Sequence, residues 1–473
     1  MYKQFLYKFA ERCGVHISAF VVNIVLARLL APQAYGIMAV INAFITVSQV
    51  LLQGGLNTAL IQKTDADEDE YFSISVITLA FSVVFCSILM LTAPLISSLY
   101  SDPTITAPLR VLSLVLIVQA VASVYNARVV AKMQFKVLMK ATLCATLISG
   151  VICIGLAYAG AGIWALVVQQ MLSAGLTTLL LMAQIRWIPK GKFDLKKAKK
   201  LFSFGWRIMV TNLIVRGNVE ATALIIGKVF SPSVLAFYNR GKQFPQVVSD
   251  NIDGALQGVS LPVFAKEKEP EKIVAKLREF IDLSTFFLYP ILALLAVLSG
   301  KIILILLKEQ WLECVPFFII WCIYYMLVSH TTLCTQAIIG VGDSSLALKR
   351  QILNTLISIT TLVISIVIWK DAVIMLWCML GAKVINTAIT MKMCKTRLPY
   401  YYGAQLRDVL VNVPATAGSA FLAYAVSFCI ENIYLEAFVQ CVIMLVAYLL
   451  LSGIFNKSGL KSVLNTIGSL LKK

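Results

Sequence analysis

Polar side chains recur at helical spacing inside four long apolar stretches of this chain. Residues 37–61 carry a set with steps of three or four residues: Asn42, Thr46, Gln49, Gln53 and Asn57. Residues 238–264 repeat the spacing with Asn239, Gln243, Gln246, Asp250, Asp253 and Gln257. Two further sets are Asn212, Arg216 and Glu220 within 204–230, and Arg12, His16 and Asn23 within 9–30. Residues three or four apart share a helix face, so each stretch would present one polar stripe.

The stripes predict a hydrated cavity that binds a ligand. Arg12 and Arg216, together with Arg207, could hold an anionic group such as a diphosphate, because a guanidinium matches phosphate oxygens. The alternative is that the Asn and Gln side chains only bond helices to one another. Arg216 and Glu220 could also neutralise each other, and Arg12 could lie at the head groups.

Acidic and outer basic residues add two further hypotheses. Asp250 and Asp253 could couple transport to protons, since carboxylates inside a bilayer mark ion pathways, or they could pair with basic residues. A lone histidine such as His16 is more often a packing residue than a proton relay. Three basic residues near the outer ends of the stretches could line an outer gate or extend to the interface: Arg28, Lys228 and Arg240.

The elements that carry these residues are expected to be transmembrane helices. The 473 residues are 59% hydrophobic and 14% charged, and the apolar runs approach the ~20 residues that span a bilayer. Such runs must be helical because lipid cannot satisfy backbone polar groups. We predict an all-α membrane protein with about fourteen spans: 9–30, 37–61, 72–99, 109–131, 139–159, 162–185, 204–230, 238–264, 280–306, 314–340, 350–369, 372–393, 408–430 and 433–455.

An internal repeat divides these spans. The hexad Ala27–Pro32 (Ala-Arg-Leu-Leu-Ala-Pro) has a counterpart in Gly227–Pro232 (Gly-Lys-Val-Phe-Ser-Pro). Six helices separate the copies, so the halves would be parallel six-helix lobes around a central cavity. We predict an N-terminal lobe at 1–190, a C-terminal lobe at 191–400, and two extra helices with an amphipathic cytoplasmic tail at 401–473.

Charge and cysteine patterns narrow the function classes. The net charge is +18, and most Lys and Arg residues fall in alternate connectors, which predicts that both termini are cytoplasmic. These residues would meet anionic membrane lipids and not nucleic acid. The eleven cysteines are scattered. The sequence has no P-loop and no metal-ligand spacing, and its loops are too short for an active-site domain. We expect a transporter without a metal or other cofactor, and not an enzyme.

Short motifs then suggest a family. The segments Leu26–Gly36, Ile225–Lys228 with Phe237–Arg240, Val259–Phe264 and Gly340–Asp343 together resemble bacterial polysaccharide flippases of the O-antigen, capsule or teichuronic-acid type. These belong to the multidrug/oligosaccharidyl-lipid/polysaccharide exporter superfamily. The resemblance implies alternating-access transfer of undecaprenyl-diphosphate-linked oligosaccharide across the bacterial cytoplasmic membrane, alongside other polysaccharide assembly proteins. It also implies that Glu220 contributes to H+ or Na+ coupling.

Two other functions remain open. A cation-coupled multidrug exporter of the same fold would favour an acidic cavity, yet Arg12, Arg207 and Arg216 balance Glu220, Asp250 and Asp253. A membrane-embedded glycosyl-transfer enzyme would need an exposed acidic or nucleophilic loop, and the sequence offers none.

Overall fold

All regular structure in the described part of the chain is helical. The computed structural model describes residues 2–53, 67–428 and 432–457, together with residues 55, 57, 60, 63, 430 and 459. These residues contain no β-strand, and eleven of their helices are long and apolar enough to cross a membrane. The predicted all-α membrane architecture is confirmed.

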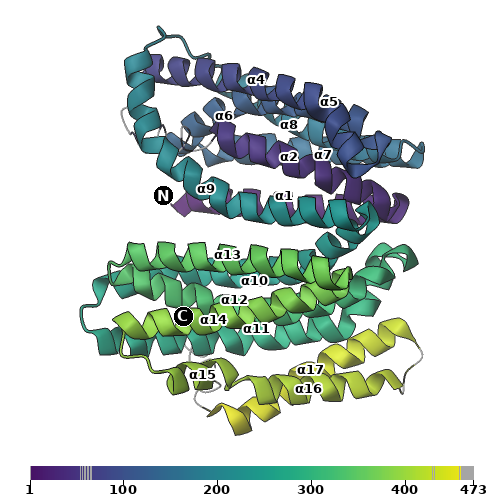
Figure 1. Ribbon diagram of the computed structural model, residues 1–473, viewed down its shortest axis with the longest axis vertical. Coiled ribbons are helices and arrows are strands. Elements are labelled where there is room, and N and C mark those ends of the chain that lie inside the picture. The colour runs from purple at the N-terminus through teal and green to yellow at the C-terminus, as the bar shows by residue number, and fades with distance from the viewer. Residues whose placement is uncertain are drawn as a thin grey trace. The chain divides into compact units, whose positions relative to one another are not determined.

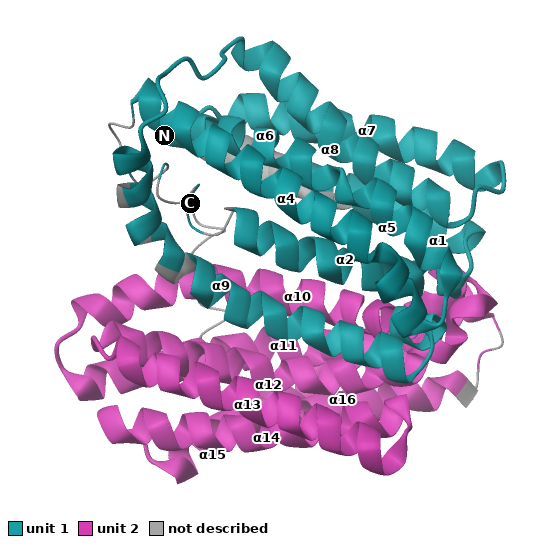
Figure 2. Ribbon diagram, turned by 45° about the horizontal axis from the view of Figure 1, so that its top comes forward, with its two compact units in different colours: residues 1–236 teal, residues 237–473 magenta. Residues whose placement is uncertain are grey.

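Residues 1–236 form one compact unit (Figures 1 and 2). Its helices are α1 (Tyr2–Leu29), α2 (Pro32–Gln53), α4 (Glu68–Tyr100), α5 (Thr106–Ser113), α6 (Val115–Ala131), α7 (Phe135–Tyr158), α8 (Ile163–Ile185) and α9 (Leu195–Val229), with a 3-10 turn at Pro103–Ile105. Helix α7 packs against α1 and α8, and α6 packs against α4 and α8. Helix α9 packs against α2 and α4. The apolar core of this unit includes Leu26, Ile41 and Leu116, all fully buried.

Residues 237–473 form the second unit. It contains most of α10 (Pro232–Lys266), followed by α11 (Pro270–Leu307), α12 (Val315–Gly340), α13 (Ser344–Trp369), α14 (Ala372–Arg397), α15 (Tyr402–Leu410), α16 (Val413–Ala425) and α17 (Ile433–Phe455), with 3-10 turns at Glu309–Cys314 and Val426–Phe428. Helix α12 packs against α11 and α14, and α13 packs against α14 (Figure 1). Helices α16 and α17 pair and lie against α11.

Three of the fourteen predicted spans are not among the eleven apolar helices. In α1 the continuous run of described side chains, Ser18–Leu29, is apolar but shorter than a span, and α10 carries the long polar stripe. The predicted span 408–430 is divided between α15 and α16, because Pro414 lies in the first turn of α16, where its missing N–H costs no helical hydrogen bond. The number of fourteen crossings therefore stays a prediction.

The repeated hexads mark two equivalent helix ends. Helix α1 ends at Leu29 and α2 begins at Pro32, while α9 ends at Val229 and α10 begins at Pro232. Proline is favoured at a first helical position because its φ is already helical. The second copy also lies against the first turns of α2, since a Cβ on Gly36 would lie 1.7 Å from the carbonyl oxygen of Pro232. The motif thus encodes a tight corner that occurs twice.

The segment between α8 and α9 is fastened to the start of α4. The Lys192 N–H donates to Asp69 Oδ1 at 2.8 Å, and Lys197 Nζ donates to Asp67 Oδ2 at 2.6 Å and Asp69 Oδ2 at 3.1 Å. The hydrogen bond from Lys197 holds the pKa of Asp67 below its ordinary value. Gly191 lies so close to this corner that a Cβ would be 2.7 Å from the Cα of Asp69.

Because α9 packs against α2 and α4, it belongs to the first compact unit. The predicted lobe boundaries at 190/191 and 400/401 were drawn from the sequence repeat, not from packing, and stay predictions. The predicted amphipathic tail falls almost entirely outside the described residues.

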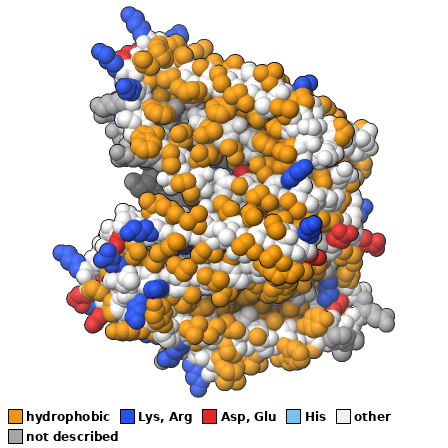
Figure 3. All heavy atoms as spheres, viewed as in Figure 1, with side chains coloured by type: hydrophobic (Ala, Val, Ile, Leu, Met, Phe, Trp, Pro, Cys, Tyr) orange, Lys and Arg blue, Asp and Glu red, His pale blue; other side chains and the backbone are white. Residues whose placement is uncertain are grey.

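Large apolar side chains are exposed along many helices. Leu91 is 78% exposed, Val151 72% and Leu450 68%. Hydrophobic side chains cover much of the visible surface in Figure 3. Such a surface suits contact with lipid tails and would be a liability in water.

Candidate functional site

A buried polar network lies among α10, α12 and α14 in the second unit. The Asp253 side chain on α10 is only 5% exposed, and its Oδ2 accepts a hydrogen bond from the Ser249 hydroxyl at 3.1 Å. Four-residue spacing on one helix explains this bond. The sequence singled out Asp253, and the structure places it in the interior of its own unit.

Lys383 is a basic member of this network that sequence reasoning missed. Its side chain on α14 is 7% exposed, and Nζ donates to Thr331 Oγ1 of α12 at 2.9 Å. The ammonium lies 5.7 Å from the ring centroid of Tyr324 and shares the interior of the second unit with the Asp253 carboxylate, whose Oδ1 is buried without a hydrogen-bond partner in the described structure. A buried charge is tolerated when an opposite charge and hydrogen bonds compensate it. The signal in the sequence was a lysine at the centre of an apolar span, which by default indicates function.

Other polar residues of α10 have partners within the second unit. Gln257 Oε1 accepts a hydrogen bond from Gln336 Nε2 of α12 at 3.2 Å, and Gln243 Oε1 accepts one from Arg240 Nη1 at 2.7 Å. Asp250 is exposed and Gln246 is half-buried. One end of the stripe thus bonds helices together, while Asp250 is accessible.

The polar residues of the first unit fall on helices α1, α2 and α9. Asn23 Nδ2 donates to Ala19 O within α1 at 2.9 Å. Gln49 and Asn57 are half-buried, and Asn57 Oδ1 is buried without a hydrogen-bond partner in the described structure. The side chains of Arg12, His16, Gln53 and Arg207 lie outside the described part of the molecule.

Two of the three predicted polar side chains on α9 are accessible. Asn212 and Arg216 are exposed, and Glu220 is half-buried. Helix α9 packs against α2, and just beyond the end of α2 a Cβ on Gly55 would lie 2.0 Å from the Gly205 carbonyl oxygen of α9. The structure therefore brings two of the predicted polar helices together within one unit.

The three predicted outer basic residues have different surroundings. Arg28 is exposed. Lys228 Nζ donates to the carbonyl oxygen of Leu99, which ties α9 to the end of α4. Arg240 is 8% exposed, and its guanidinium lies 5.3 Å from the ring centroid of Trp311. Lys228 and Arg240 each stabilise packing inside their own unit.

Metal chemistry finds no support in the part of the chain that the structure describes. It contains no group of three His, Cys, Asp or Glu residues that could hold a metal ion. What the geometry offers is a buried Asp253 and a buried Lys383 in one unit, and an accessible Asn–Arg face in the other.

Comparisons with known proteins place these features in a family. A family model described as "Polysaccharide biosynthesis protein" matches residues 25–316. The teichuronic acid biosynthesis protein TuaB of Bacillus subtilis is 25% identical over 57% of this chain and 56% of its own length. The succinoglycan biosynthesis transport protein ExoT of Rhizobium meliloti is 24% identical over 64% of this chain and 61% of its own length. The chain thus spans less than two thirds of either relative.

Solved structures share the fold. The lipid II flippase MurJ in an inward closed conformation superimposes with a TM-score of 0.77 at 14% identity, over 96% of this chain and 99% of that chain. An inward-facing multidrug resistance MATE transporter of the MOP superfamily superimposes with a TM-score of 0.63 at 12% identity, over 80% of this chain and 94% of that chain. At these identities the likeness defines the fold alone.

Proposed function

The chain belongs to the polysaccharide biosynthesis protein family, and on that basis we propose that it is a flippase for lipid-linked oligosaccharide. The substrate would be an undecaprenyl-diphosphate-linked glycan, moved from the inner to the outer leaflet by alternating access. The observation that carries the proposal is the family match over residues 25–316, which includes both hexads and the polar residues of α2, α9 and α10.

The names of the relatives agree with this substrate class. Two concern teichuronic acid and succinoglycan, both polysaccharides, and the second is called a transport protein. The fold likeness to a lipid II flippase extends over nearly the whole chain. Since a multidrug transporter shares the fold, fold alone does not separate the two functions.

The charges of the binding face favour an anionic substrate. The exposed guanidinium of Arg216, one turn from the exposed amide of Asn212, is suited to bidentate contact with a diphosphate. A drug exporter for cationic substrates would benefit from net negative charge, so the exposed guanidinium of Arg216 disfavours that alternative.

Energy coupling would involve the carboxylates. Asp253, buried in the same unit as Lys383, is suited to exchange a proton or to bind an entering cation. Asp250 and Glu220 are further candidates for H+ or Na+ coupling. An unchanged dependence of transport on pH in both Asp253→Asn and Asp250→Asn would remove proton coupling at these residues.

The location follows from the same reasoning. The chain is a multi-pass membrane protein, and we place it in the bacterial cytoplasmic membrane with both termini inside. It would work alongside other polysaccharide assembly proteins and would itself break no covalent bond.

Deletion of the gene tests the proposal directly. A flippase predicts that an undecaprenyl-linked glycan accumulates on the cytoplasmic side, whereas an exporter predicts drug sensitivity without such accumulation. In complementation, Arg216→Ala should lose most activity and Arg216→Lys should retain part of it, while Arg407→Ala, an exposed arginine on α15, serves as the control. Full activity of Arg216→Ala would exclude a role in holding the substrate.

A further inference from the structure

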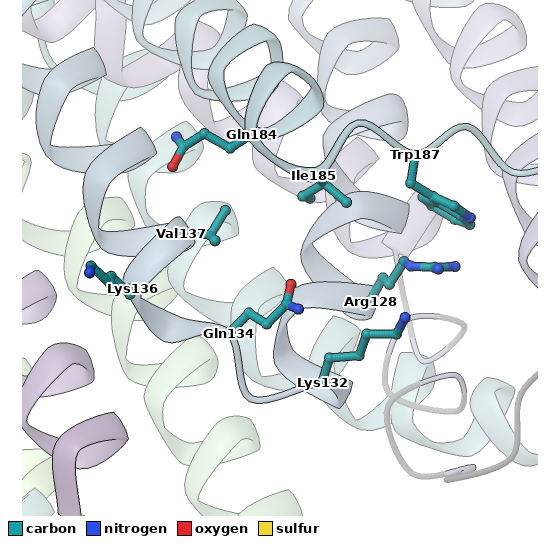
Figure 4. Close-up of a pocket in the computed structure, with 8 residues that line it drawn as sticks. All are labelled: Arg128, Lys132, Gln134, Lys136, Val137, Gln184, Ile185 and Trp187. Atoms are coloured by element: carbon teal, nitrogen blue, oxygen red, sulfur yellow. The ribbon is translucent and has the colours of Figure 1, made fainter.

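The first unit has a basic pocket that the transport stripes do not use. It lies at the turn between α6 and α7 and has a volume of about 380 Å³. Three basic residues, Arg128, Lys132 and Lys136, line it together with Gln134, Gln184 and Trp187 (Figure 4). None of the residues that line it is acidic. At about 30 Å³ per water molecule, the volume could hold about a dozen waters or one small polar group.

One wall of the pocket is rigid. Arg128 Nη1 donates to Glu68 Oε1 at 2.8 Å, and its guanidinium lies 3.8 Å from the ring centroid of Trp187. Trp187 Nε1 also donates to the Glu68 carboxylate at 3.0 Å. Glu68 compensates the charge of Arg128, while Lys132 and Lys136 are exposed at the pocket and accessible to a ligand.

The turn itself has a fixed backbone conformation. Met133 adopts a left-handed φ of 53°, and the N–H groups of Met133 and Gln134 donate to Val130 O at 3.0 Å and Val129 O at 2.9 Å. This pair of bonds is the Schellman arrangement that ends a helix. The first turn of α7 that follows contains no acidic residue, so its positive dipole end adds to the field of the lysines. Lys132 and Lys136 are therefore held on either side of Gln134 (Figure 4).

The chemistry of the pocket matches a phosphate ester. Apolar side chains flank the basic ones, since Met133 is 58% and Ile188 64% exposed. Lysines, a tryptophan and exposed apolar side chains together are typical of the membrane interface. Free phosphate would need the basic residues only, whereas a lipid would also use the apolar ones.

We propose that this pocket binds the phosphate head group of an anionic phospholipid of the inner leaflet, such as phosphatidylglycerol. The lipid would serve as a bound constituent of the first unit and not as the transported substrate. The site depends on the proposed orientation, which places the turn on the cytoplasmic side, but not on which glycan is moved.

Native mass spectrometry of the full-length protein in detergent, titrated with phosphatidylglycerol or zwitterionic phosphatidylethanolamine, tests the site. Replacing both lysines, as Lys132→Gln with Lys136→Gln, should weaken phosphatidylglycerol binding by roughly 25-fold, about fivefold for each lysine. Phosphatidylethanolamine binding should not change. Gln134→Glu, which places a negative charge between the lysines, should weaken the same binding without removing a basic residue.

A matched control separates this site from general attraction to positive charge. Lys349→Gln with Lys392→Gln makes the same charge change at two exposed lysines of the second unit and should leave binding unaltered. Equal losses in both double variants, or no loss in either, would overturn the proposal. Displacement of the lipid by excess inorganic phosphate would identify a free-phosphate site and overturn the assignment to lipid. Glycan transport is measured separately, so failure of the flippase proposal leaves this result interpretable.

Discussion

Neutralising Lys383 alone should destabilise the second unit strongly. Lys383 and Asp253 are 7% and 5% exposed, so Lys383→Met would leave the Asp253 carboxylate buried without its opposite charge. Leaving a charge uncompensated in the interior typically lowers the free energy of unfolding by about 3–5 kcal/mol. Asp253→Asn should lower it by a similar amount, because the ammonium would keep its hydrogen bond to Thr331 Oγ1 at 2.9 Å and its contact with the Tyr324 ring but would lose the nearby carboxylate.

The double variant makes the prediction specific. With Asp253→Asn and Lys383→Met combined, no uncompensated charge remains, and replacing a buried pair is often neutral. We expect a coupling energy of at least about 2 kcal/mol between the two positions. For a unit of this size, each kcal/mol shifts the unfolding midpoint by roughly 2–4 °C. The single variants should therefore unfold on the order of 10 °C below the parent protein, and the double variant close to it.

Thermal unfolding of the purified protein in detergent measures these shifts. Lys370→Met, at an exposed lysine that ends α13, is the control for loss of a lysine and should leave the midpoint nearly unchanged. If the two single losses simply add in the double variant, the charges do not compensate each other. A role for Asp253 in coupling through the charge of Lys383 would then be excluded.

Two glycines give further predictions. Gly36→Ala should prevent correct folding or lower the free energy of unfolding by at least about 3 kcal/mol, because the new Cβ would lie 1.7 Å from the Pro232 carbonyl oxygen. The yield of monodisperse protein measures this effect. Gly191→Ala should detach the segment before α9 from Asp69, which hydrogen exchange would show as faster exchange of the Lys192 amide, and unchanged exchange there would contradict the contact. Gly217→Ala is the control for both, since a Cβ there meets open space.

The sequence predicted those features that depend on local rules. Helical runs follow from the need to satisfy the backbone in lipid, and the hexads predicted equivalent helix ends because proline starts a helix. The stripe on α10 singled out Asp253, whose partner Ser249 lies four residues earlier on the same helix. These signals all act within a few residues along the chain.

Features that depend on pairing between distant segments were not predicted. Nothing near Lys383 in the sequence indicates that α14 would bring it to Thr331 and Asp253. The contact between Gln257 and Gln336 likewise joins helices whose relative rotation only packing determines. The attachment of Lys197 to Asp67 and Asp69 joins the first turns of α9 and α4, which are far apart along the chain.

The polarity of α10 also has a consequence for how the protein is made. This helix is not among those apolar enough to be recognised as a span, and α9 is the least apolar of those that are. A translocon that admits segments one at a time by hydrophobicity would retain such helices poorly. We expect α9 and α10 to enter the bilayer only after the strongly apolar α11 has emerged from the ribosome, so that biogenesis of this region is delayed and sensitive to truncation within α11.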